Sequence, residues 1–277
     1  MGHAIADVAR TFAANRAVGG IALAVRASAG VTRRSRVRED GALRVRCPGP
    51  ASGELQAVIV NTAGGIAGGD SFTLDVTVER RARLVVTTAA AEKVYRTLAP
   101  EATIDVKLDV AAAASLAWLP QETILFDRAR LKRTIDIDLA EDARVVLAEA
   151  IVFGRSGMGE TVDDGFLLDR WRVRRGGRLI HAEAMRLDGA VAARLAQPAV
   201  AKGGIAVATV LVVPGDEGTA AGVRALGDHM RGEVGVSAWN GLAVVRLCAA
   251  DGEALRHDLV AVLAALRGAP LPRLWLN

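Results

Sequence analysis

The sequence predicts a mainly β protein, with a layered or β-helix-like body of repeated strand pairs and a small C-terminal α/β portion. Three observations predict it. Apolar and polar residues alternate over many short stretches, as on strands with one buried face. A similar triplet recurs about every thirty residues, and helix-like spacing arises only near the C-terminus. We expect one unit over residues 1–277, with the β body over 1–205 and a C-terminal portion over 206–277 packed on it.

Length and composition bound the class of protein. A chain of 277 residues that is 51% hydrophobic can bury a sizeable core. Cys47 and Cys248 form no C-x-x-C pair, so we expect no disulfide framework. The N-terminus lacks the basic-then-apolar order of a signal peptide, and no apolar run reaches the ~18 residues of a membrane span. These features predict a cytoplasmic protein without a membrane partner.

The first unusual segment is Asn61–Asp70, which contains Gly64, Gly65, Gly68 and Gly69. Glycine adopts positive φ without steric cost and lets other groups approach the backbone closely. The spacing from Gly64 to Gly69 matches a phosphate-binding loop, but Asp70 stands where that loop requires lysine and would repel phosphate. We interpret the glycines as a structural turn that presents the Asp70 carboxylate.

A repeat of strand pairs begins at Ser71, and the triplet Leu74–Val76 lies in its first strand. The predicted first strands are residues 71–79, 104–110 and 131–139, and the second strands that follow them are 83–88, 115–120 and 144–149. A weaker fourth copy consists of residues 170–174, Gly176–Gly177 and residues 178–183. Strand pairs at this period indicate stacked rungs, although a sandwich of hairpins has the same spacing.

The alignment of the repeats puts Glu149 and Glu183 in the same column. Because adjacent strands lie ~4.8 Å apart, stacking would bring these two carboxylates close together. Two such carboxylates repel each other unless a proton, a cation or an arginine lies between them. His181 lies two residues before Glu183, so alternation places both on one face of the strand.

The C-terminal portion has mixed periodicity. We expect strands over residues 205–213 and 242–248, a helix over 219–230, and a closing helix over 254–266 that ends at Gly268 and Pro270.

No catalytic constellation is present in the sequence. His3, His181, His229 and His257 are scattered, without the spacing of a closed zinc site. The loop Gly154–Thr161 also copies phosphate-loop spacing, but Glu160 replaces the lysine. Two arginine runs, Arg33–Arg38 and Arg170–Arg175, alternate with other residues, which favours the solvated face of a strand over a polyanion site.

Several segments together resemble the urease accessory protein family UreD, also called UreH. They are Asn61–Asp70, Ala91–Arg96, Trp118–Phe126, Phe153–Glu160 and Leu271–Leu276, in family order over nearly the whole chain. The resemblance implies a scaffold without enzymatic activity that binds apo-urease and a UreF-like protein, which recruits a UreG-like GTPase. It implies no nucleic-acid partner and no tightly bound cofactor.

The resemblance also implies that nickel passes through an internal polar route during insertion into urease. By motif match, the acids of that route would be Asp70, Glu149 and Glu183. A few carboxylates suit weak and transient binding of a divalent ion better than a thiolate cage does.

Two other functions fit parts of the sequence. A polyanion-binding β protein would use the arginine runs, and its affinity would fall steeply with salt. A β-solenoid enzyme would use Glu149 and Glu183 as an acid–base pair. The ordered resemblance favours the urease accessory scaffold over both.

Overall fold

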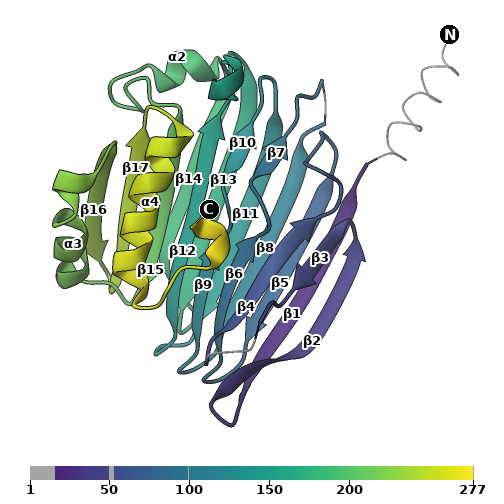
Figure 1. The fold of residues 1–277 in the computed structure, drawn as a ribbon, viewed down its shortest axis with the longest axis vertical. Coiled ribbons are helices and arrows are strands. Elements are labelled where there is room, and N and C mark those ends of the chain that lie inside the picture. The colour runs from purple at the N-terminus through teal and green to yellow at the C-terminus, as the bar shows by residue number, and fades with distance from the viewer. Residues whose placement is uncertain (1–15, 50–52, 99, 277) are drawn as a thin grey trace, which may run out of the picture.

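Two β-sheets packed face to face form the body of the protein (Figure 1). The computed structural model describes residues 16–49, 53–98 and 100–276, so the first 15 residues of the predicted β body, and His3 among them, lie outside it. Sheet A consists of β1 (Val18–Ser28), β2 (Val31–Gly41), β5 (Ser71–Val78), β8 (Ala102–Val110), β11 (Arg130–Leu139), β13 (Gly165–Arg175) and β14 (Arg178–Gly189).

The second sheet, sheet B, packs against sheet A and also contains the last strands of the chain. It consists of β3 (Leu43–Arg46), β4 (Leu55–Asn61), β6 (Arg83–Thr88), β9 (Ser115–Leu119), β12 (Arg144–Phe153), β15 (Ala206–Val213), β16 (Glu233–Trp239) and β17 (Leu242–Ala249), with the short strands β7 (Glu92–Val94) and β10 (Thr123–Leu125) at one end. The helices are α2 (Val191–Leu195), α3 (Glu217–Arg224) and α4 (Gly252–Arg267), with 3₁₀ turns at Ser156–Met158, Gly227–His229 and Arg273–Trp275.

The predicted repeat is confirmed for three strand pairs. β5, β8 and β11 are parallel neighbours in sheet A, and β6, β9 and β12 are parallel neighbours in sheet B. Each first strand is joined to its second strand by four residues, 79–82, 111–114 and 140–143, which carry the chain from one sheet to the other. The prediction of stacked rungs is therefore confirmed for these three strand pairs, and the alternative, a sandwich of hairpins, is wrong.

The fourth copy differs, so the predicted stacking of Glu183 on Glu149 is wrong. Only Gly176 and Gly177 separate β13 from β14, and both have positive φ, +55° and +78°. Such a pair forms a tight hairpin turn, because positive φ at both positions matches the twist of an antiparallel pair. β14 therefore pairs with β13 in sheet A, while Glu149 lies on β12 in sheet B.

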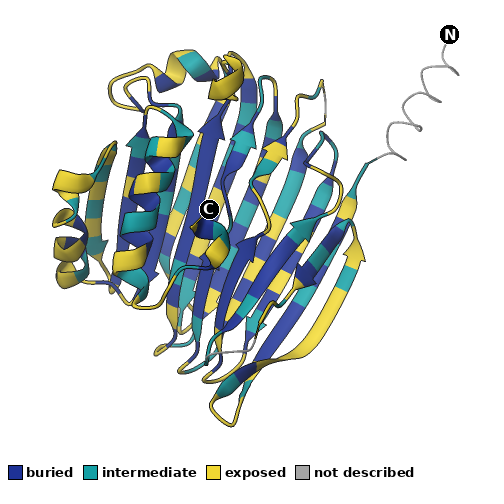
Figure 2. Ribbon diagram, in the orientation of Figure 1, coloured by how far each residue is buried: buried dark blue, intermediate teal, exposed yellow. Residues whose placement is uncertain are grey.

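The apolar faces of both sheets meet in one core. In β5 the residues Phe72, Leu74, Val76 and Val78 are buried while their neighbours are more exposed, as the alternation predicts (Figure 2). A second apolar cluster lies between the other face of sheet B and α4, whose Leu255, Leu259 and Leu263 are buried. β15 pairs with β12, so the C-terminal strands continue sheet B directly.

Candidate functional site

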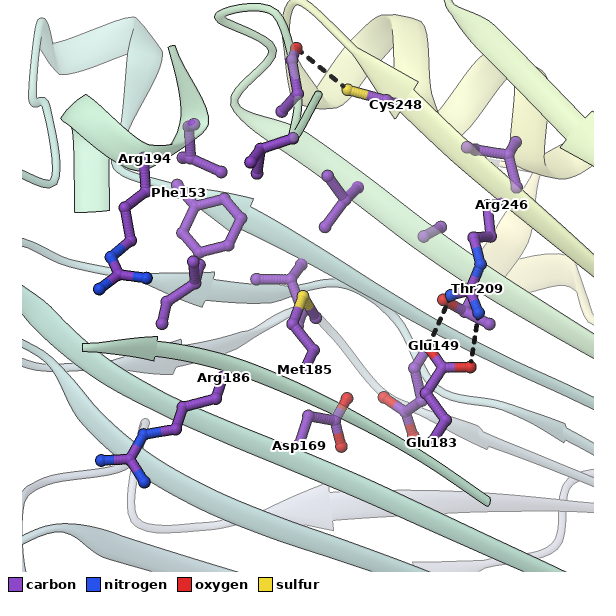
Figure 3. A pocket seen from close by; sticks show the side chains of 18 of the residues that line it. Glu149, Phe153, Asp169, Glu183, Met185, Arg186, Arg194, Thr209, Arg246 and Cys248 are labelled. Atoms are coloured by element: carbon purple, nitrogen blue, oxygen red, sulfur yellow. Dashed lines mark hydrogen bonds and ion pairs between the residues drawn. The ribbon is translucent and has the colours of Figure 1, made fainter. Parts of the chain in front are cut away.

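A cavity of about 510 Å³ opens between the two sheets beside β14, β15 and β17. Figure 3 shows that polar side chains from both sheets enter it, among apolar residues such as Phe153 and Met185. Glu149 and Glu183, the two acids predicted to stack, line it from opposite sheets. Its polar lining also includes Asp169, Thr209, Gln197 and three arginines, Arg186, Arg194 and Arg246. The structure therefore brings the two glutamates to one cavity by a different arrangement from the one predicted.

A buried charged triad closes the inner end of this cavity. Arg133 of β11 lies between Asp169 of β13 and Glu149 of β12. Its Nε donates to Asp169 Oδ1 at 3.0 Å and its Nη2 to Oδ2 at 2.6 Å, while its Nη1 donates to Glu149 Oε2. Two tryptophans contribute further donors, Trp118 Nε1 to Glu149 Oε1 at 2.8 Å and Trp171 Nε1 to Asp169 Oδ1 at 3.2 Å.

The triad contains two carboxylates but one guanidinium, and this ratio governs its protonation. Burial raises the pKa of Glu149 to about 7, because the charge of Arg133 and the hydrogen bond from Trp118 only partly offset desolvation and Asp169 adds repulsion. For Arg133, desolvation favours the neutral form, but the charges of Asp169 and Glu149 outweigh it and raise the pKa. Glu149 therefore exchanges a proton near neutral pH.

A second charged group lies toward the open end of the cavity. Arg246 of β17 donates to Glu183 of β14 through Nη1 at 2.6 Å and Nη2 at 3.0 Å. His181 Nε2 lies 3.3 Å from Glu183 Oε2 without hydrogen-bond alignment, and its ring packs 5.9 Å from that of Trp239. Burial opposes ionisation of Glu183, but His181 and Arg246 outweigh it and lower the pKa to about 2. Glu183 therefore stays ionised at neutral pH.

A smaller cavity of about 70 Å³ lies on the other side of the triad, inside the core. Its polar lining includes Glu149, Arg133, Thr88, Gln121 and Glu92. The amide of Asn61 donates to Glu92 at 3.0 Å, but burial dominates and raises the pKa of Glu92. Glu149 lines both cavities, so it lies at the boundary between them.

Asp70 lies apart from these groups, at the end of the glycine-rich turn. Its Oδ1 accepts a hydrogen bond from the backbone N–H of Ala17 at 2.8 Å, and its Oδ2 accepts one from Ala67 at 2.7 Å. The side chain is buried and lines neither cavity. Both oxygens therefore hold backbone segments together.

The glycines in this turn allow the next coil to pack against it. At Gly65 a Cβ atom would lie 2.5 Å from the Tyr95 ring, and at Gly68 it would lie 2.1 Å from Thr97 Oγ1. Gly65 also has a φ of +144°, while Gly64 and Gly69 have φ values of +78° and +87°. Close approach of residues 95–97 explains why this segment excludes side chains.

Sequence reasoning missed Arg133, Asp169, Glu92 and Arg246. A signal for the first two was present, because each is the one charged residue in an apolar series: Arg133 between Leu131 and Ile135, Asp169 between Leu167 and Trp171. These two positions are also directly paired between β11 and β13. The contact between Glu183 and Arg246 joins residues 63 positions apart, and the sequence contains no comparable signal for it.

The described residues contain no group of three or more His, Cys, Asp or Glu side chains placed to hold a metal ion together. Glu149 and Glu183 instead line the larger cavity, and Glu149 and Glu92 line the smaller one. Within the described part of the chain, no helix is long and apolar enough to cross a membrane. Cys47 and Cys248 are both free thiols.

Comparison with known proteins identifies the family. The family model for the UreD urease accessory protein matches residues 17–276. A urease accessory protein UreD from Rhodopseudomonas palustris is 56% identical over 268 residues, which cover 97% of this chain and 96% of the relative. One from Bradyrhizobium diazoefficiens is 54% identical over 266 residues, which cover 96% of each chain. The relatives are named as accessory proteins, and the chain therefore belongs to the UreD family of urease accessory proteins, with a role in urease maturation.

Proposed function

We propose that this protein is a cytoplasmic, non-catalytic scaffold that binds apo-urease and a UreF-like protein, which in turn recruits a UreG-like GTPase. We further propose that nickel, the cargo of this assembly, passes between the two β-sheets. Family membership supports the scaffold, and the polar groups in the inter-sheet core support the passage.

The observation that carries the passage is the position of Glu149 between two cavities. Glu183 and Glu149 line the larger cavity, and Glu149 and Glu92 line the smaller one, so the three carboxylates form a series. Single carboxylates are weak ligands for a borderline ion such as Ni²⁺, so each would also release it.

Arg133 makes the passage closed at rest. Its guanidinium bonds to both Glu149 and Asp169 and would repel an arriving cation. A divalent ion would have to replace Arg133 at one carboxylate, and it would also compete with the proton on Glu149. Because the pKa of Glu149 is about 7, a modest rise in pH shifts that competition toward the metal.

Asp70 has a different role in this proposal. Since both of its oxygens accept backbone hydrogen bonds, we assign it to fixing the glycine-rich turn and not to the passage.

The experiment combines Glu149→Gln and Glu183→Gln, which keep side-chain size and remove the carboxylates. The matched control combines Glu141→Gln and Glu233→Gln, whose side chains are 78% and 68% exposed. Each form is produced with the cognate urease and accessory proteins, and pull-down assembly and nickel per urease active site are measured. We expect both variants to assemble and only the first to lose nickel transfer, by about tenfold or more.

The outcomes separate the two parts of the proposal. Normal nickel loading by the assembled Glu149/Glu183 variant would eliminate the passage and leave the scaffold intact. Failure of the unmodified protein to bind either apo-urease or the UreF-like protein would eliminate the scaffold.

A further inference from the structure

β2 is an unpartnered edge of sheet A. It is 11 residues long and pairs only with β1. Figure 2 shows it exposed along most of its length at the rim of the molecule. One side of its backbone therefore presents a row of N–H and C=O groups that no described strand satisfies.

From Arg33 to Arg38 both faces of β2 are exposed, whereas Thr32 near its start is buried and Glu39 near its end is partly buried against Val45 and Arg46. Val37 is 37% exposed, although Leu23, its partner in β1, is 3% exposed. On the outer face, Arg36 and Arg38 pair with Ala24 and Ala22, small residues that leave the guanidinium groups free to reach past the edge.

The arginines of this edge lack acidic partners. Among the described residues, Arg26, Arg33, Arg34 and Arg36 form no ion pair, and Arg38 has only Asp40 at 3.8 Å. A hollow of about 540 Å³ begins at the turn between β1 and β2 and is lined by Arg80, Arg81 and Arg83 with alanine and glycine, again with no acid. From Arg33 to Arg38 the edge therefore carries a net positive charge, with Glu39 and Asp40 at the end of the strand and Glu79, which accepts a hydrogen bond from Ser35 Oγ at 2.7 Å, nearby.

An acidic strip lies on the same outer face, separated from β2 by β1. It consists of Asp75 of β5, Asp105 and Asp109 of β8, and Asp136 and Asp138 of β11. Burial and then the charges of Asp138 and Asp75 raise the pKa of Asp109, which reflects how close these acids are. A negative ligand is thus attracted along β2 and repelled by the acids of the adjacent strip.

We propose that β2 binds an acidic, extended segment of a partner protein, which adds to sheet A as one more strand. The backbone edge supplies the hydrogen bonds, and Arg36 and Arg38 contact alternate acidic side chains of the added strand. Arg33 lies on the same face beyond the bulge at Ser35 and contacts a further acid, and Val37 contacts an apolar side chain on the other face. This site is independent of the nickel passage.

The charge pattern favours a peptide over a nucleic acid. A nucleic acid is wider than one strand and would reach the acidic strip, and β2 offers no aromatic side chain on which a base could stack. Edge strands also carry charges to prevent aggregation, and absence of peptide binding would assign the β2 charges to that role.

The probe is a fluorescent decapeptide of five Val-Glu repeats, titrated against the full chain and followed by anisotropy. We expect the unmodified chain to bind the peptide. We expect the affinity to fall about tenfold or more in the variant Arg33→Glu/Arg36→Glu/Arg38→Glu. The matched control, Arg170→Glu/Arg172→Glu/Arg174→Glu, makes the same charge change on β13 of the same face and is expected to keep the affinity. Circular dichroism establishes that both variants are folded.

Two further titrations test strand addition itself. Peptides N-methylated at the odd or at the even positions keep every carboxylate, and we expect one of the two to lose binding because it cannot pair with the edge. Equal binding of both N-methylated peptides, an unchanged affinity in the β2 variant, or no binding of the unmodified peptide would each overturn the proposal. Tighter binding of a 20-residue oligothymidine would assign the edge to nucleic acid instead.

Discussion

Glu149 and Glu183 line the same cavity and each bonds to an arginine, yet their pKa values are shifted in opposite directions, to about 7 and about 2. Glu149 shares Arg133 with Asp169, and the side chains of the Glu149–Arg133 pair are 4% exposed. Glu183 has Arg246 to itself, with His181 beside it, and Arg246 is 58% exposed. The comparison shows that the number of carboxylates per guanidinium and the depth of burial decide whether a buried acid keeps its charge.

The largest expected effect comes from removing each arginine. Arg133→Met leaves two buried carboxylates without a counterion, and we expect a loss of about 3–5 kcal/mol in the free energy of unfolding. Arg246→Met breaks a partly exposed pair and is expected to cost about 1 kcal/mol or less. Urea denaturation of both variants at pH 7 measures the difference.

A cost for Arg133→Met no larger than that for Arg246→Met would contradict this difference between the two arginines. The triple variant Arg133→Met/Glu149→Gln/Asp169→Asn is the control, because it removes the stranded charges. We expect it to be more stable than Arg133→Met alone.

The next effect is a dependence of stability on pH with opposite sign at the two sites. The pKa of Glu149 in the folded state, about 7, lies above the ordinary value of 4.5, so the folded state holds an extra proton and stability falls as pH rises from 4.5 to 7. The pKa of Glu183 is lowered to about 2, so its contribution is present above pH 4.5 and is lost as pH falls toward 2.

Glu149→Gln and Glu183→Gln isolate these two contributions. The unfolding free energy of Glu149→Gln minus that of the unmodified protein is expected to rise by about 3 kcal/mol as the pH increases from 4.5 to 7.5. Glu183→Gln should instead change the profile only below pH 4.5. Urea unfolding at a series of pH values from 3 to 8 checks both, and parallel profiles for the two variants would contradict the assignment.

A smaller effect is expected from the tryptophan donors. Trp118→Phe removes the hydrogen bond to Glu149, and Trp171→Phe removes the one to Asp169. Asp169 still accepts two hydrogen bonds from Arg133 after that change. Both variants lose similar apolar contact, so we expect similar costs of about 1–2 kcal/mol at pH 5. At pH 8 Trp118→Phe should cost more, because losing the donor raises the pKa of Glu149 further. Thermal unfolding at the two pH values measures this, and equal costs at pH 8 would show that Trp118 does not stabilise the ionised carboxylate.

The sequence allowed the body of the fold to be predicted, because alternation and recurrence report directly on strands that bury one face. The strands from Ser71 to Phe153 and the C-terminal helix of residues 252–267 lie close to their expected positions. The prediction for the fourth copy was wrong. Its similarity to the other strand pairs did not reveal that a two-glycine turn returns the chain antiparallel to β13 within the same sheet.

The site was less accessible to sequence reasoning. Glu149 and Glu183 were named, but their arginine partners were not. Arg133 was detectable as a charge in an apolar series, whereas the pairing of Glu183 with Arg246 depends on how β17 packs opposite β14. Such a contact between sheets follows from tertiary packing and has no local signature.

The most direct test of the account is ¹³C NMR of the glutamate carboxyl groups in the full chain, titrated with pH and then with paramagnetic Ni²⁺. We predict that Glu149 titrates near pH 7 and Glu183 near pH 2. We also predict that Ni²⁺ at pH 8 broadens both signals while that of the exposed Glu141 stays sharp. Titration of Glu149 near pH 4.5, or equal broadening of all three signals, would contradict these predictions.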